Sequence, residues 1–163
     1  MADSTPTPAY DFLTGEGKVQ EKVARVRTML ADVPLFKGLS DRYLDEIGRL
    51  SVPEERPAND ELVRQGDQGA DFVLIVDGSA RVERNGQVIA HINAGDYIGE
   101  LALLDGQPRT ATVITDEPST VLILRKHAFD HIVESNPELE HHFLLTLVQR
   151  IRDLQATLMD QQK

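Results

Sequence analysis

The sequence predicts an α+β fold in which an antiparallel β-roll, or jelly-roll barrel, stands between N-terminal helices and a long C-terminal helix. Glycine spacing is the first indication, because seven of the eleven glycines lie between residues 66 and 106. Short apolar runs, each long enough for one strand, fill the intervals between these glycines. Glycine turns about 8–12 residues apart are typical of rolled antiparallel sheets and small barrels. The third indication is a helical period on both sides of this region.

The roll is assigned to residues 52–125. Its clearest apolar strands are expected at residues 72–76, 80–82, 88–92, 110–115 and 120–124. Asn85 and Gly86 stand between two of these runs, and this dipeptide is the strongest short signal for a hairpin in the chain. Tyr97 and Ile98 are expected to end a further strand just before Gly99.

Apolar residues before the roll repeat with the period of a helix. Those of the first helix are Val19, Val23, Val26, Leu30 and Val33. Pro34 ends this helix, and Ser40 is the expected N-cap of a second, shorter helix. Residues 18–51 are therefore assigned to N-terminal helices. Residues 1–17 contain two prolines and two glycines and are predicted to be a flexible tail.

Residues 126–163 are assigned to a hinge and a long helix that acts as a lid or a dimer seam. Neither glycine nor proline occurs from residue 138 to 163. Apolar residues there recur at alternating intervals of three and four: Leu144, Leu147, Ile151, Leu154 and Leu158. This stripe fits a helix packed on its own barrel, and it also fits a seam with a second copy of the chain. The two interpretations are compatible if the first half of the helix packs on the barrel and the second half pairs with another copy.

Composition excludes several classes of function. The chain has 17 Lys and Arg against 27 Asp and Glu, a net charge of −10, which argues against DNA, RNA or an anionic membrane as partner. It has no cysteine, which excludes disulfides, thiolate catalysis and Cys-ligated metal. Its apolar runs are far shorter than the about 20 residues that span a bilayer. The N-terminus also lacks the features of a signal peptide, so we expect a cytoplasmic protein.

Residues 99–113, with the sequence GELALLDGQPRTATV, carry the most informative chemistry. Residues 101–104 can form one short helical turn, and free backbone amides at such a turn favour an anion. Glu100 can accept a hydrogen bond from a ligand hydroxyl, and Arg109, expected at the head of a strand, can supply guanidinium donors. Donors for one negative charge beside an acceptor for a hydroxyl describe a ribose phosphate.

This segment resembles the phosphate-binding cassette of cyclic nucleotide-binding domains. That family includes the regulatory subunits of cyclic-AMP-dependent protein kinase and the bacterial catabolite activator protein. The resemblance covers roughly residues 33–158. Its further blocks are Leu35-Phe36, Gln65-Gly66-Asp67, residues 76–79, residues 95–100 and Asn136-Pro137. Chance does not place independent blocks in this order, so the set is specific.

The resemblance implies a role for each residue of the cassette. The cyclic phosphate would be held by Arg109 and by the backbone amides of Glu100, Leu101 and Ala102, which follow Gly99. The Glu100 carboxylate would bind the ribose 2′-hydroxyl. The resemblance thus implies a sensor of a cyclic nucleotide and not an enzyme, with no catalytic residue, no metal and no cofactor.

The base would be contacted by residues outside the phosphate cradle. Thr110 would add a hydroxyl to the phosphate or the base, and Val82 and Ile89 would line the base. Leu154 lies where the catabolite activator protein has a Thr-Ser pair that binds adenine, so an apolar lid is expected here. A Thr after the arginine resembles cyclic-GMP-preferring kinases, but bacterial members with Ser or Thr there often take cyclic AMP. We expect cyclic AMP, with cyclic GMP as the alternative.

The resemblance also implies a mechanism. Ligand bound to the cassette would pull a hinge near Phe129, and the long helix would close over the base. The output would lie in an effector protein, in a homodimer through residues 138–163, or in an output domain absent from this chain. The chain stops at Lys163 without the DNA-reading helices of the catabolite activator protein, so no DNA partner is expected.

Two alternatives stay open at this point. One is an interaction module that dimerises through the same helix and binds no ligand. The other is a metal site on a cupin-like roll, which is weakened because His91 has no second histidine two residues away.

Overall fold

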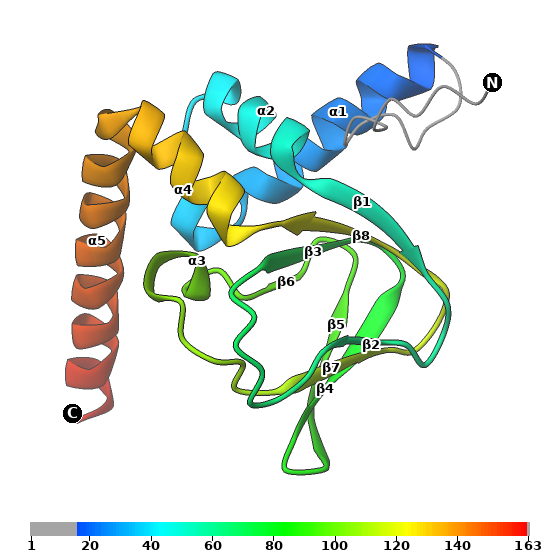
Figure 1. Ribbon diagram of the computed structural model, residues 1–163. Coiled ribbons are helices and arrows are strands. Elements are labelled where there is room, and N and C mark those ends of the chain that lie inside the picture. The colour runs from blue at the N-terminus through cyan, green and yellow to red at the C-terminus, as the bar shows by residue number, and fades with distance from the viewer. Residues whose placement is uncertain (1–15, 163) are drawn as a thin grey trace.

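The computed structural model describes residues 16–162, and residues 1–15, the main part of the expected tail, lie outside them. Two four-stranded antiparallel sheets face each other, and helices cover one of them (Figure 1). The elements in chain order are α1 (Glu16–Ala31), the 3-10 helix η1 (Pro34–Phe36), α2 (Asp41–Leu50), β1 (Val52–Arg56), β2 (Glu61–Val63), β3 (Phe72–Asp77), β4 (Ser79–Arg84), β5 (Gln87–Asn93), β6 (Tyr97–Ile98), α3 (Ala102–Asp105), β7 (Thr112–Thr115), β8 (Ser119–Leu124), α4 (Lys126–Ser135) and α5 (Pro137–Gln161).

The first sheet has the strand order β1-β8-β3-β6 and the second the order β2-β7-β4-β5. Strand β3 shows how the two sheets and the helices share the core, because successive side chains of a strand point to opposite faces. Phe72, Leu74 and Val76 pack with the helices. Val73 and Ile75 pack against the second sheet. Burial on both faces explains why this strand is an unbroken apolar run.

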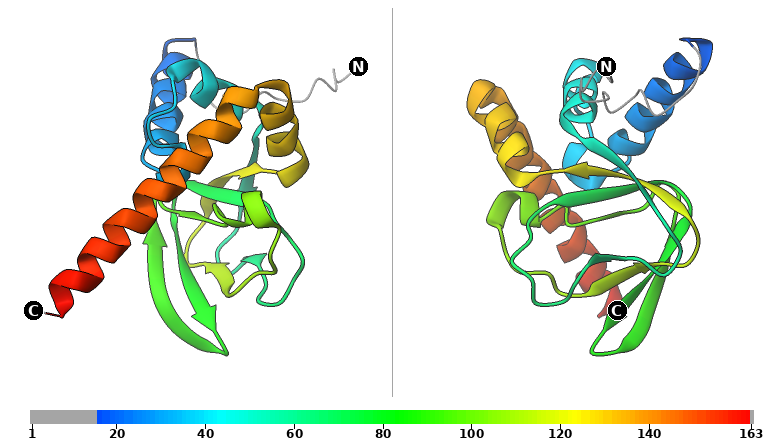
Figure 2. Two further views of the ribbon diagram at one scale, coloured as in Figure 1. Left: turned by 90° about the vertical axis from the view of Figure 1, so that its left-hand side faces the viewer. Right: turned by 45° about the vertical axis from the view of Figure 1, so that its right-hand side comes forward.

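Aromatic contacts fix the helices on the outer face of the first sheet. The Phe36 and Phe72 ring centroids are 5.5 Å apart, and those of Phe129 and Phe143 are 5.4 Å apart. Phe143 lies in the first turns of α5, which are buried there together with Leu139. The rest of α5 extends past the roll, as the left view of Figure 2 shows.

The structure confirms the predicted fold class and the hairpin. Arg84 pairs with Gln87, so Asn85 and Gly86 alone form the turn. Their φ angles are +52° and +77°. Two successive positive φ values are typical of a type I′ turn, whose twist matches the flanking strands.

Several predicted boundaries were wrong. Helix α1 begins at Glu16 rather than at residue 18. Strand β7 begins at Thr112 rather than at residue 110, so Arg109 lies in a loop and does not head a strand. The prediction that Ser40 is the N-cap of α2 is confirmed in position, although its side chain forms no capping hydrogen bond.

Candidate functional site

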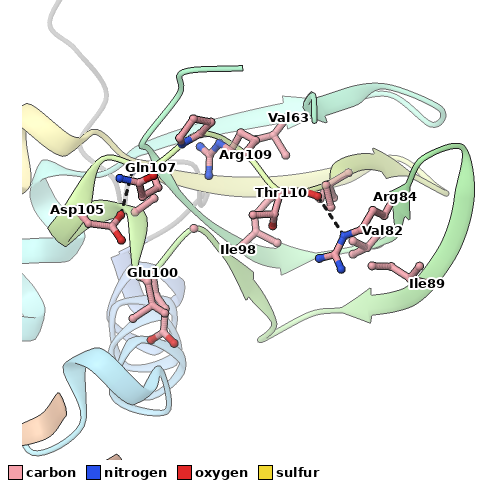
Figure 3. A pocket seen from close by; sticks show the side chains of 16 residues that line it. Val63, Val82, Arg84, Ile89, Ile98, Glu100, Asp105, Gln107, Arg109 and Thr110 are labelled. Carbon is pink, nitrogen blue, oxygen red and sulfur yellow. Dashed lines mark hydrogen bonds between the residues drawn. The ribbon is translucent and has the colours of Figure 1, made fainter. Parts of the chain in front are cut away.

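A pocket of about 470 Å³ lies between the β4–β5 hairpin and the loop that joins β6 to β7 (Figure 3). Of the residues that the sequence predicted to contact a ligand, those lining it are Gly99, Glu100, Leu101, Ala102, Arg109, Thr110, Val82 and Ile89. Its volume suits one small ligand. Residues far apart in the chain are therefore brought to one site.

Arg109 is a half-buried cation in the wall of this pocket. Its Nη2 donates a hydrogen bond to the carbonyl oxygen of Asp71. Among residues 16–162 no carboxylate lies within ion-pair distance of its guanidinium. Burial lowers the pKa of Arg109, and the nearby Asp71 carboxylate opposes this effect. A partly desolvated cation that forms no ion pair attracts an anion from solution.

The backbone of Arg109 is fixed by the turn after β2. Its amide donates to the carbonyl of Asp67 at 2.9 Å, and the amide of Gly66 donates to the carbonyl of Arg109 at 2.8 Å. These two bonds hold the loop beside the pocket without making it part of a strand.

Gly99 allows the guanidinium to lie against the chain. Its φ of +83° is in the region that favours glycine. A Cβ at this position would overlap Arg109 Nη1, and it would lie 2.6 Å from the carbonyl oxygen of Asp71. A residue with a side chain here would therefore displace the arginine or its backbone acceptor.

Free backbone donors lie next to the arginine. The amides of Glu100, Leu101 and Ala102 donate to no protein acceptor within the described part of the chain. Together with the Arg109 guanidinium, they form a set of donors suited to one anionic group.

The Glu100 carboxylate has partners on other elements. This residue is 8% exposed. Its Oε2 accepts a hydrogen bond from the Leu35 amide at 3.0 Å, and its Oε1 lies 3.0 Å from Arg150 Nη2. In Figure 3 its side chain points away from Arg109 and Thr110. A carboxylate offers about four acceptor positions, so binding of a ribose hydroxyl stays a prediction.

Comparison with known families decides what kind of domain this is. The family described as the cyclic nucleotide-binding domain matches residues 53–136. The chain belongs to this family.

Relatives of this cyclic nucleotide-binding domain occur in larger proteins. It is 33% identical over 138 residues to a cAMP-dependent protein kinase regulatory subunit of Mycosarcoma maydis, covering 77% of this chain and 26% of that protein. It is 33% identical over 122 residues to a cyclic nucleotide-gated potassium channel of Rhizobium etli, covering 75% of this chain and 34% of the channel. The chain thus spans about a quarter to a third of these relatives.

Solved structures resemble it in fold. The N-terminal domain of a transcriptional regulator from Streptomyces coelicolor matches with a TM-score of 0.72 and 26% identity. The match covers 77% of this chain and 94% of that one. In the cyclic nucleotide-binding domain described here, none of the helices in residues 16–162 is long and apolar enough to cross a membrane. The same residues contain no cluster of three His, Cys, Asp or Glu suited to a metal ion.

The structure does not bring Leu154 to the pocket of this cyclic nucleotide-binding domain. Leu154 is 64% exposed and lies on a separate hollow between η1 and α5. Its predicted role as a lid therefore requires α5 to take another position. The wall predicted to contact a base is also open, since Ile89 is 51% exposed.

The sequence reasoning missed contacts that tie the cassette to the C-terminal helices. Lys126, the first residue of α4, donates from Nζ to the carbonyl of Leu103 at 2.7 Å. Its backbone amide donates to Asp71 Oδ1 at 3.3 Å. Because Asp71 also accepts from Arg109, the arginine of the nucleotide-binding domain is linked to the start of α4.

Proposed function

We propose that this domain binds cyclic AMP or cyclic GMP in the pocket at Arg109, and that binding changes the position of α5. The observation that carries the proposal is the half-buried Arg109 guanidinium, which has no carboxylate partner in residues 16–162. The chain's similarity to a cAMP-dependent kinase regulatory subunit and to a cyclic nucleotide-gated channel supports a cyclic nucleotide as ligand.

The pocket offers a partner for each part of such a ligand. The cyclic phosphate fits the donors of Arg109 and of the amides from Glu100 to Ala102. The ribose hydroxyl would bind the Glu100 carboxylate after that side chain turns from Arg150 toward the pocket, since a carboxylate keeps acceptor positions to spare. The base fits between Val82 and Ile89, which line the pocket beyond Thr110.

Contacts between the cassette and the C-terminal helices support a movement of α5. Glu100 is paired with Arg150 of α5, and Leu103 is bonded to Lys126 of α4. A ligand that draws the cassette toward the phosphate pulls on both contacts. The ligand shifts the helix only as far as it binds the two arrangements differently.

The domain itself carries no catalytic role in this proposal. Its output would pass to an effector protein or to a further domain, because its relatives are several times longer than the matched region. A cytoplasmic location stays a prediction.

We also propose that residues 138–163 pair with a second copy of the chain. The stripe residues Leu144, Ile151, Leu154 and Leu158 are each 55–64% exposed. Their spacing places them on one face of α5, as in the seam of a coiled coil. An exposed apolar face of this kind indicates an interaction surface.

Calorimetric titration of the purified chain with cyclic AMP and cyclic GMP tests the proposed ligand. Saturable heat with one site per chain is expected. Ligand at 100 times its Kd should also raise the free energy of unfolding by about 2.7 kcal/mol. Absence of both effects with millimolar nucleotide would contradict the proposed function.

A further inference from the structure

Arg84 lies in the pocket but belongs to no part of the cassette. It ends strand β4, in which alternate residues face the same way. Ala80 is buried between the sheets, Val82 lines the pocket, and Arg84 lines the pocket at its outer end. On this face of β4 the apolar residues Ala80 and Val82 are therefore followed by the cation Arg84.

Arg84 differs in its partners from Arg81 on the same strand. Arg81 pairs with Asp116 at 2.8 Å and with Glu83 at 3.2 Å. Arg84 forms no ion pair with any carboxylate that the structure describes, and its Nε donates instead to the carbonyl oxygen of Thr110 at 3.2 Å. This bond leaves the two terminal nitrogens of the guanidinium as donors beside Val82 and Ile89 (Figure 3).

The hairpin that carries Arg84 is held in place. The Gln65 side chain donates to Asn85 Oδ1 at 3.0 Å and accepts from the Asn85 amide at 2.9 Å. The Gln65 amide donates to Thr112 Oγ1 at 2.9 Å. Arg84 is therefore presented from an anchored turn, although its side chain is exposed.

Arg84 lies at the hairpin end of the pocket, and Thr110 lies between it and Arg109 (Figure 3). A nucleotide whose phosphate contacts Arg109 extends its base toward Arg84. This placement rests on the proposed function above.

We propose that Arg84 determines base specificity by donating two hydrogen bonds to the O6 and N7 edge of guanine. Guanine presents two adjacent acceptors on that edge, and a guanidinium presents two matching donors. Adenine presents N7 beside the N6 amino group, whose hydrogens would face a donor. Arg84 thus favours cyclic GMP over cyclic AMP, which differs from the expectation drawn from the sequence.

Titration of the chain with cyclic GMP, cyclic IMP and cyclic AMP distinguishes recognition of the O6 and N7 edge from recognition of the 2-amino group. Cyclic IMP keeps O6 and N7 but lacks the 2-amino group of guanine. A bidentate contact corresponds to roughly 5- to 150-fold discrimination, so cyclic GMP and cyclic IMP should both bind at least fivefold more tightly than cyclic AMP. If cyclic IMP binds like cyclic AMP, the 2-amino group is what the site recognises, and the inference is wrong.

Substitutions of Arg84 test whether its side chain is responsible for the selectivity between nucleotides. Arg84→Ala should weaken cyclic GMP and cyclic IMP at least fivefold and leave cyclic AMP within about twofold. Arg84→Lys keeps the positive charge but lacks the paired donors of the guanidinium, so it should retain little of the selectivity. Arg81→Ala, on the outer face of the same strand, is the matched control and should leave the ratios unchanged.

Two further outcomes of these titrations would contradict the proposed role of Arg84. Equal weakening of all three nucleotides by Arg84→Ala would mean that the residue acts without reading the base, and would overturn the inference alone. Failure of the unaltered chain to bind any of them would overturn the proposed function and this inference with it. Thermal melting of Arg84→Ala should match the unaltered chain, since this exposed side chain makes one hydrogen bond.

Discussion

The carboxylate of Glu100 and the guanidinium of Arg150 form an ion pair that joins the cassette to α5, with Oε1 and Nη2 3.0 Å apart. The Glu100 side chain is 9% exposed and that of Arg150 34% exposed. The second carboxylate oxygen accepts from the Leu35 amide in η1. One acidic side chain thus connects the pocket, the N-terminal helices and the C-terminal helix.

Arg150→Ala should lower the free energy of unfolding, because it leaves a buried carboxylate with only the Leu35 amide as partner. The expected loss is about 1–3 kcal/mol, below that of a fully buried pair since Arg150 is partly exposed. Urea denaturation measures it. Arg152→Ala, at an exposed position of the same helix, is the control and should change stability by less than about 0.5 kcal/mol. Equal effects of the two substitutions would mean that the ion pair contributes nothing measurable.

Gly99→Ala should be among the more damaging single changes in the cassette. The positive φ costs about 1–2 kcal/mol for any residue with a Cβ. The contact with the Asp71 carbonyl adds an overpacking cost of about 1–3 kcal/mol, because that atom is backbone and cannot turn away.

Gly95→Ala is a matched control for this change. Gly95 has a φ of +93°, and a Cβ there would meet nothing within 4 Å. It carries the conformational cost alone, so the difference between the two variants in urea unfolding measures the close approach at Gly99. A Gly99→Ala variant no less stable than Gly95→Ala would show that Asp71 and Arg109 can shift at little cost.

Arg109→Ala should weaken cyclic nucleotide binding by about 2–5 kcal/mol, because a buried phosphate would lose its charged partner. Calorimetry of the variant against the nucleotide that the unaltered chain binds measures the loss. Arg64→Ala removes an exposed arginine that pairs with Glu61 outside the pocket, and should bind normally. Affinity of Arg109→Ala within twofold of the unaltered chain would mean that the phosphate lies elsewhere.

Tyr43 of α2 donates a hydrogen bond to Glu138 in the first turn of α5. This bond lowers the pKa of Glu138 and raises the pKa of Tyr43. A carboxyl whose pKa is lowered by folding contributes stability above its unfolded pKa, and the contribution is lost as pH falls through the folded value. Tyr43→Phe should therefore be less stable than the unaltered chain at neutral pH, and the difference should shrink in acid.

Urea unfolding of both proteins from neutral to acidic pH measures this difference. Glu138→Gln should show the same narrowing. Glu140→Gln removes an exposed carboxylate from the same turn and serves as the control. A difference between Tyr43→Phe and the unaltered chain that stays constant with pH would mean that the phenol acts by packing.

The cassette could be predicted from the sequence because its chemistry is local. Gly99, Glu100 and Arg109 stand close together in the chain, so their types and spacing carry the resemblance, and the roles that it implies stay predictions. The resemblance placed Val82 in the pocket, and strand alternation carried two residues further along β4 would have added Arg84.

The remaining features of the site and the fold depend on tertiary packing, which a local sequence pattern does not predict. The partners of Glu100 come from η1 and α5, and the acceptor of Arg109 is a backbone carbonyl, which any residue supplies. Strand β1 was not recognised individually because Pro53 and its charged neighbours resemble a loop. It forms at the sheet edge, where proline is tolerated, by pairing with β8. The place of Leu154 follows from the direction of α5 after its buried first turns.

Ile151→Glu tests the proposed pairing through α5. Ile151 is 55% exposed and stands in the middle of the stripe, so a charge there should leave the isolated chain folded and disrupt a seam between two copies. Sedimentation velocity is expected to show a dimer for the unaltered chain and a monomer for the variant. Leu145→Glu is the matched control, because Leu145 is equally 55% exposed but lies off the stripe. Dissociation by both substitutions alike would indicate a different interface, and a monomeric unaltered chain at high concentration would exclude the pairing.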